Sequence, residues 1–346
     1  MAAQSRPEEG RLLAAGRRLL REARVIDWWA LFYYPTLTLL AIFGRGASEG
    51  RGLVIALSLL LGAWALSAVV VGRSGLVRQG LVPALYYRLS ISLPIVGSYL
   101  LLKTLLPIVR TDNYDAALYA IDVALFGVEP TLWLDRLVSP FLTEWLSFFY
   151  YLYFYLMTTF ILGVLLTIDD VQIGIEFGVS ATLSFCLGHL LYMIVPGYGP
   201  HSFLAGQFSH ELPHGLFYGL VVDTVTQAGA KKDIFPSLHT AVPTLFTLFA
   251  LRHRHRVRAF RYAWPVLAFI ACNMIAATVY LRWHYLVDVL VGLVHASSML
   301  LLATWVARWD QARSARLGLG TPWPQLKQPH PLGALSPKEA IGRSRS

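Results

Sequence analysis

Three residues of this chain have the types and the spacing of a nucleophilic catalytic group. His239 lies in the segment FPSLHTAVP, and His284 and Asp288 lie in the segment LRWHYLVDVLVG. On a helix, the four-residue spacing places Asp288 on the same face as His284. A carboxylate there can bind one ring nitrogen, which fixes the tautomer and leaves the other nitrogen able to attack an electrophile. The pattern predicts His284 as a nucleophile that Asp288 orients.

The residues around His239 suit an anionic group such as a phosphate. A helix is expected to begin there, so Ser237 can cap it and backbone N–H groups at the helix start can face an anion. His239 can then donate a proton to a leaving oxygen as a general acid. Lys231, Lys232 and Arg282 are expected in the same neighbourhood, where they can neutralise phosphate oxygens.

Two other functions fit the same residues. Two histidines and one aspartate can form a three-ligand zinc site, although the segment PSLH suits an anion better than a metal. Charged residues within membrane segments also occur in transporters, which commonly contain repeated halves. The chain shows no convincing internal repeat. The preferred prediction is therefore an enzyme that uses neither a metal nor a cofactor.

The composition indicates which elements must position these residues. Of 346 residues, 56% are hydrophobic and 14% are charged, whereas about 25% are charged in an ordinary soluble domain. This excludes a purely soluble protein and an intrinsically disordered one. A membrane crossing needs about 20 apolar residues, and we expect an all-α polytopic membrane helix bundle with about eight transmembrane helices and a six-helix catalytic core. The apolar runs lie near residues 26–44, 53–72, 84–107, 142–167, 174–195, 240–251, 263–281 and 285–307.

The same pattern divides the chain into four parts. Residues 1–25 form a basic, potentially helical segment that suits a membrane surface. Residues 26–82 carry two transmembrane helices, and residues 83–311 carry the catalytic membrane core. Residues 312–346 are rich in Pro, Gly, Ser and charge, and such a composition buries too little apolar surface to offset the entropy of ordering. That segment is predicted to be a disordered cytoplasmic tail.

Basic residues predict the orientation, because Lys and Arg stay on the cytoplasmic side during insertion. They concentrate in both tails and in the segments after the second and sixth apolar runs, so both termini should be cytoplasmic. The polar segments 108–141 and 196–239 then face outward, which places the active site on the extracytoplasmic face, with the plasma membrane as the expected location. Asp112, Asp115 and Asp122 in the first segment can shape an acceptor site, but solvated loop positions are the expectation. The net charge of +9 favours anionic lipids as partners rather than nucleic acid.

Two motifs carry a resemblance to a known family. PSLH, followed 45 residues later by the segment that starts at His284, resembles the second and third signature motifs of the phosphatidic acid phosphatase type 2 (PAP2) superfamily. The dipeptide His284-Tyr285, the run from Asp233 to His239 and the segment LFGVEPTLWL are similar to the inositol phosphorylceramide synthase branch, an inositolphosphotransferase type. The resemblance covers about residues 115–307.

The resemblance implies a phosphotransferase in the membrane that acts on lipid phosphates or phospholipid head groups. It implies that His284 forms a phosphohistidine, that Asp288 orients it, and that His239 acts as the acid and later as the base, without a metal. A lipid phosphate phosphatase, which transfers the phosphoryl group to water, is the alternative with the same intermediate.

The chain departs from the superfamily pattern at two positions that bind phosphate. The first motif ends in Arg, whereas the matching segment PGYGPH ends in His201; the third motif has Arg six residues before its His, where this chain has Thr278. Other residues must therefore hold the phosphate. The candidates are Arg282, Lys232 and His201, together with the cap residue Ser237.

Overall fold

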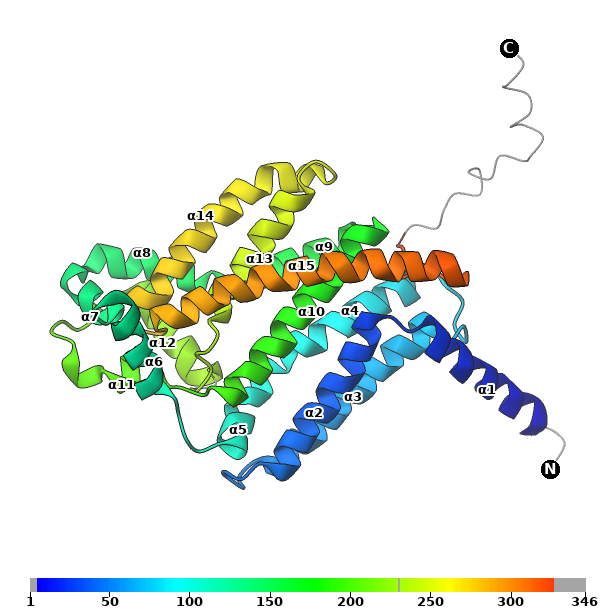
Figure 1. Cartoon of the computed structure of the whole chain (residues 1–346), viewed down its shortest axis with the longest axis horizontal. Helices are drawn as coiled ribbons and strands as arrows, with labels where there is room; N and C mark the ends of the chain where they lie inside the picture. Colours follow the sequence, from blue (N-terminus) through cyan, green and yellow to red (C-terminus); the bar gives the residue numbers. More distant parts are fainter. Residues whose placement is uncertain (1–4, 230, 327–346) are drawn as a thin grey trace, which may run out of the picture.

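The computed structural model describes residues 5–229 and 231–326, and this part of the chain is helical without any strand (Figure 1). Its α-helices and two short 3-10 helices follow in the order α1 (Ser5–Glu22), α2 (Val25–Phe43), α3 (Arg51–Arg73), α4 (Leu81–Gly97), α5 (Tyr99–Val109), α6 (Asp115–Phe126), α7 (Pro130–Leu134), η1 (Asp135–Leu137), α8 (Pro140–Tyr151), α9 (Tyr153–Thr167), α10 (Val171–Ile194), α11 (Pro200–Phe203), η2 (Ala205–Gln207), α12 (Leu216–Ala228), α13 (Leu238–His253), α14 (Arg258–Tyr280) and α15 (Leu286–Leu317).

The helices confirm the prediction of a polytopic membrane bundle. Among the described residues, six spans are long and apolar enough to cross a membrane: α2, α3, α8 with α9, α10, α14 and α15. Two helix pairs that are bent at a short break bring the number to as many as eight, namely α4 with α5, bent by 43°, and α6 with α7 and η1, bent by 66°. Figure 1 shows the short helices α6, α7, α11 and α12 gathered at one end of the bundle, whereas α1 lies at the opposite end.

Two segments differ from the simple eight-span expectation. Helix α13 has 16 residues and is shorter than an ordinary crossing. The segment 108–141, expected to be a polar segment that faces outward, contains the bent pair of α6 and α7, which is a further candidate span. The bend has a local cause: Gly127 ends α6 in the left-handed region, with a φ of 76°, and Pro130 begins α7.

Helices α13 and α15 begin side by side, and this contact brings the two sequence motifs together. The backbone N–H of Ser237 donates to the carbonyl oxygen of Asp288 at 3.1 Å. Gly292 permits the close approach, because a Cβ atom there would lie 2.7 Å from the carbonyl oxygen of Ser237. The starts of both helices are therefore fixed relative to each other.

The long helix α10 lies in the core and is tied to α13 at the end opposite the motifs. Glu176 on α10 is fully buried and accepts hydrogen bonds from Arg252 and His253 at the end of α13, each at 3.0 Å. A buried carboxylate needs such partners. The contact holds both ends of α13 in place.

The tail predicted to be disordered is ordered as far as residue 326, which corrects the prediction for that part. Helix α15 continues to Leu317, and Trp323 beyond it is only 1% exposed. Gly174 leaves room for the indole, since a Cβ atom there would lie 2.4 Å from the ring of Trp323. One buried tryptophan removes about 200 Å² of surface from water. The free energy gained by this burial offsets the entropy cost of ordering its polar neighbours. The remainder of the segment 312–346 lies outside the described residues.

Candidate active site

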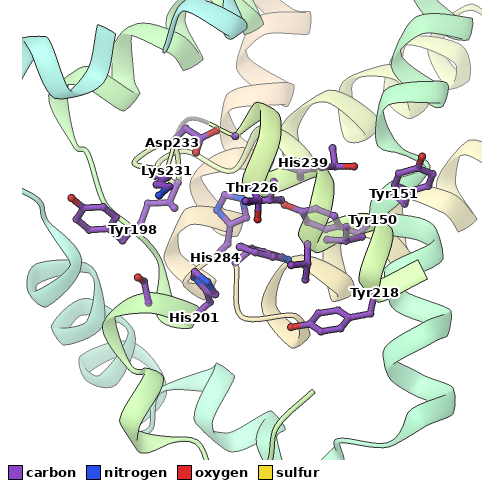
Figure 2. A pocket seen from close by; sticks show the side chains of 18 of the residues that line it. Tyr150, Tyr151, Tyr198, His201, Tyr218, Thr226, Lys231, Asp233, His239 and His284 are labelled. Atoms are coloured by element: carbon purple, nitrogen blue, oxygen red, sulfur yellow. The ribbon is translucent and has the colours of Figure 1, made fainter. Parts of the chain in front are cut away.

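A cavity of about 420 Å³ opens at the end of the bundle where α13 and α15 begin (Figure 2). Its wall is formed by residues of α5, α8, α9, α11, α12 and α13, by the loops before α11 and α13, and by the turn between α14 and α15. His239 and His284 both line it, and Figure 2 shows their side chains near its centre. The two residues that the sequence singled out therefore share one cavity.

The ring of His239 is held between two tyrosines. Its centroid lies 4.4 Å from that of Tyr150, with 14° between the ring planes, and 4.2 Å from that of Tyr153. On the open side, the ring of His284 lies 6.1 Å away, centroid to centroid. In an attack on phosphorus, the nucleophilic nitrogen approaches to about 3 Å, whereas a general acid contacts the leaving oxygen. The two rings face one cavity, in which a substrate can meet both.

Asp288 faces His284 through a cap rather than through a turn of helix. His284 lies in the turn before α15, and Asp288 is the third residue of the helix, where its Oδ2 atom accepts from the N–H of Tyr285 at 3.0 Å. The same oxygen lies 3.4 Å from Nδ1 of His284, which is longer than an ordinary hydrogen bond. The predicted proximity exists, but the helical spacing expected to produce it does not.

Burial keeps the imidazole of His284 uncharged. Only 3% of the residue is exposed, and this burial lowers the pKa of His284 to about 4, although the carboxylate of Asp233 and a backbone hydrogen bond to Ile234 act in the opposite direction. A neutral imidazole has the lone pair that a nucleophile needs. With Nδ1 facing Asp288, the Nε2 atom is the nitrogen that remains for attack.

A second acid fixes the start of α15. Asp122 on α6 is fully buried, and its two carboxylate oxygens accept from the N–H groups of Leu286 at 2.7 Å and Val287 at 2.8 Å. These are the first residues of the helix that follows His284. The position of the imidazole therefore depends on a residue more than 160 positions earlier in the chain.

Asp115 lies on the same face of α6 as Asp122, and it holds the loop on the other side of the cavity in place. It is also fully buried and accepts from the N–H groups of Tyr198 at 2.9 Å and Gly199 at 2.8 Å, and from the hydroxyl of Tyr285 at 3.2 Å. The expectation of a solvated loop position was wrong for Asp115 and Asp122, whereas Asp112 is exposed as expected. Their separation by two helical turns, which gives them a common face, is the signal in the sequence that points to a shared role.

Lys232, predicted to contact phosphate, points away from the cavity. Its side chain is buried, and Nζ donates to the carbonyl oxygens of Thr111 at 2.8 Å and Asp112 at 3.1 Å. The neighbouring Lys231 has the opposite orientation and lines the cavity. The sequence placed both lysines in the right region but could not tell their directions apart.

Arg282 is also engaged elsewhere. Its guanidinium forms an ion pair with Asp135 at 2.7 Å, donates to the carbonyl oxygen of His210 at 2.6 Å, and stacks on the ring of Phe208 at 3.8 Å. The backbone of Arg282 adopts a φ of 67°, which is uncommon for a residue other than glycine. These contacts fix the turn that carries His284, and the geometry does not favour a direct role in phosphate binding.

The other two predicted phosphate ligands differ in their positions. Ser237 is fully buried and caps α13, where its hydroxyl accepts from the N–H of Thr240 at 3.3 Å, and it does not line the cavity. His201 does line the cavity, with its ring 4.6 Å from that of Trp283. His201 and Lys231 are thus the members of the predicted set that a substrate in the cavity can reach.

Asp233 is a lining residue whose role the sequence did not indicate, although it begins the run that ends at His239. It is half-buried, and its Oδ2 atom accepts from the hydroxyl of Tyr99 at 2.7 Å. Burial raises the pKa of Asp233. The direction of such loop side chains depends on the fold of the segment 196–239, which includes the helix α12 that the sequence did not predict.

Within residues 5–229 and 231–326, no three His, Cys, Asp or Glu side chains are placed to hold a metal ion. Comparison with known families gives a match to the model described as the PAP2 superfamily, over residues 116–302. Neither the curated proteins nor the solved structures give a match. The matched region covers more than half of the chain and contains His239, His284 and Asp288. Members of this superfamily are enzymes that act as phosphatases or phosphotransferases. The chain belongs to the PAP2 superfamily.

Proposed function

We propose that the protein is a membrane phosphotransferase that acts on lipid phosphates or phospholipid head groups through a phosphohistidine at His284. One observation carries the proposal: the imidazoles of His239 and His284 open into one cavity, 6.1 Å apart, with the carboxyl group of Asp288 behind the second ring. Such a trio can form and resolve a covalent intermediate.

In the first step, the Nε2 lone pair of His284 attacks the phosphorus atom and an N–P bond forms. The P–O bond to the leaving group breaks, and His239 gives its proton to the departing oxygen. The proton on Nδ1 of His284 stays in place, and the nearby carboxylate of Asp288 stabilises the positive charge that develops on the ring.

In the second step, an acceptor hydroxyl takes the place of the leaving group. His239, now neutral, removes the proton of this hydroxyl while its oxygen attacks the phosphorus atom. The N–P bond breaks, and its electron pair returns to His284. Both histidines are then in their starting states, and no redox partner is needed.

The cavity wall supports an amphiphilic substrate. Helix α12 contributes Val221, Val222 and Val225 to one side, and Phe154 on α9 adds a further apolar surface. The imidazoles, Lys231 and Asp233 form the polar side. A lipid can therefore place its phosphate at the histidines and its apolar part against α12.

The size of the cavity supports transfer to an alcohol rather than to water alone. Its volume of about 420 Å³ is many times the roughly 30 Å³ that one water molecule occupies in the liquid. This volume is compatible with an acceptor alcohol beside the phosphate, as an enzyme similar to inositol phosphorylceramide synthase requires. Together with the distribution of basic residues, the location of the cavity at the end of the bundle where α13 and α15 begin supports an active site on the extracytoplasmic face of the membrane.

The proposal can be tested with purified protein and a panel of labelled phospholipids, with and without acceptor alcohols. We expect head-group exchange that depends on the acceptor, and release of free phosphate alone would favour the phosphatase alternative. His284→Ala should abolish turnover and the acid-labile phosphoenzyme. His255→Ala, which changes an exposed histidine in the turn after α13, is the matched control and should leave both unchanged. Robust turnover by His284→Ala would refute the mechanism.

A further inference from the structure

We propose that Lys231 and Asp233 select a singly charged phosphodiester as the donor and disfavour a doubly charged phosphomonoester. The inference rests on the proposed function, because it concerns the charge of the phosphorus group that His284 attacks. Both residues lie in the loop before α13, and Figure 2 shows them near each other beside His284.

The charges around the cavity carry the argument. Among its lining residues in the described part of the chain, Lys231 is the one lysine or arginine, and Asp233 is the one aspartate or glutamate. Lys231 supplies one positive charge, and Asp233 opposes it with one negative charge. The protein therefore supplies little net positive charge to a phosphate.

The other cations near the cavity are bound to protein groups. Lys232 donates to two backbone carbonyl oxygens, and Arg282 pairs with Asp135 at 2.7 Å. Arg110 pairs with Asp112 at 2.6 Å. None of these three side chains lines the cavity, so within the described residues they do not add to the charge that a substrate meets there.

This balance distinguishes two classes of donor. A phosphomonoester has a second pKa near 6 and carries about two negative charges at neutral pH. A phosphodiester carries one. A second negative charge placed a few ångströms from a carboxylate in a partly enclosed site is strongly disfavoured. The cavity thus matches the charge of the diester.

Asp233 is held where it is and cannot readily turn away from a substrate. The hydroxyl of Tyr99 donates to its Oδ2 atom at 2.7 Å, and its backbone pairs with Gly197 on the neighbouring loop. Asn at this position keeps the shape of the side chain and an oxygen that accepts from Tyr99. Asp233→Asn therefore removes the charge while it preserves the contacts.

The diester determines what the enzyme carries between the two steps. The N–P bond forms at His284, the P–O bond to the diacylglycerol breaks, and the proton of His239 passes to the diacylglycerol oxygen. The head group stays esterified to the phosphorus on His284. The acceptor alcohol then receives the head-group phosphate as a unit, and the proton of the alcohol returns to His239.

The test compares two donors with identical acyl chains, phosphatidic acid as the monoester and phosphatidylglycerol as the diester, in detergent micelles at pH 7.5. The full-length protein should give the higher kcat/KM on the diester. Asp233→Asn should raise the monoester-to-diester ratio of kcat/KM by about tenfold or more. Lys231→Met should lower kcat/KM for both donors, mainly through KM, and Lys231→Arg should restore it. Asp223→Asn removes an exposed acid of α12 that does not line the cavity, and it should leave the ratio unchanged.

Several results would overturn the inference. One is a preference of the unmodified protein for phosphatidic acid, a result that does not depend on the folding of any variant. Another is an unchanged ratio in Asp233→Asn. Failure of the proposed function looks different, because turnover of both donors would then persist in His284→Ala.

Discussion

Replacing Asp288 with Asn tests how much of the chemistry depends on the carboxylate behind His284. The side chains are almost isosteric, and the Asn oxygen can still accept from the N–H of Tyr285, so the cap of α15 is retained. The change removes one negative charge that lies 3.4 Å from Nδ1 of His284. In the variant, the other contacts of the turn still hold the His284 ring in position.

The size of the effect follows from that distance. Two unit charges 3.4 Å apart interact by about 5 kcal/mol at an effective dielectric constant near 20. This interaction is gained only when the ring becomes positive in the transition state, so its loss raises the barrier by up to that amount. Since about 1.4 kcal/mol corresponds to tenfold, we expect the rate of phosphoenzyme formation to fall by roughly three powers of ten.

The assay is single-turnover formation of the acid-labile phosphoenzyme from a labelled phospholipid, with thermal unfolding in detergent measured on the same samples. Asp310→Asn is the matched control, because it changes another buried acid of α15 far along the helix from the cavity. It should leave the rate near that of the unmodified protein. A fall of less than tenfold in a folded Asp288→Asn variant would show that the carboxylate caps the helix and does not support the chemistry.

Three further predictions concern the pH profile and the stability of the site. Because burial lowers the pKa of His284 to about 4, this ring is charged only below that pH, so protonation of the nucleophile should reduce kcat/KM only near pH 4; a loss of activity centred near pH 6.5 would contradict this. Asp122→Ala leaves two N–H groups at the start of α15 without their charged partner and should cost about 3–5 kcal/mol, seen as a lower melting temperature and a lower kcat. Asp112→Ala, at an exposed acid, should leave the melting temperature nearly unchanged. Trp323→Ala should destabilise the protein by about 3–5 kcal/mol, as measured by thermal unfolding, and equal stability would mean that the segment after α15 does not contribute to the fold.

The pairing of the two histidines could be predicted because it follows from the number of helices between them. His239 and His284 each lie where a polar segment enters an apolar run, and one intervening helix, α14, returns the chain to the same end. The lengths of the apolar runs alone are enough to predict that α13 and α15 begin at the same end of the bundle. The class of fold and the ends of the main helices follow from the same signal.

The side chains that surround the histidines could not be predicted in this way. Lys231 and Lys232 are adjacent and chemically equal, and only the path of the loop decides that one lines the cavity while the other binds carbonyl oxygens. Trp323 lies in a segment whose composition favours disorder, yet the burial of this one side chain holds the segment against the helix bundle. Such outcomes depend on individual tertiary contacts, which average properties of a segment do not describe.

The capping of α15 bears on how the substrate is held. The N-terminus of a helix usually attracts anions, but here Asp122 and Asp288 accept from the N–H groups of its first residues. Protein carboxylates thus neutralise the positive end of α15, the helix that follows His284. This helix end therefore attracts a phosphate only weakly. The phosphate must find its partners across the cavity, where Lys231 supplies a positive charge and His239 an imidazole. A site built in this way holds its nucleophile rigidly and binds a single negative charge better than two.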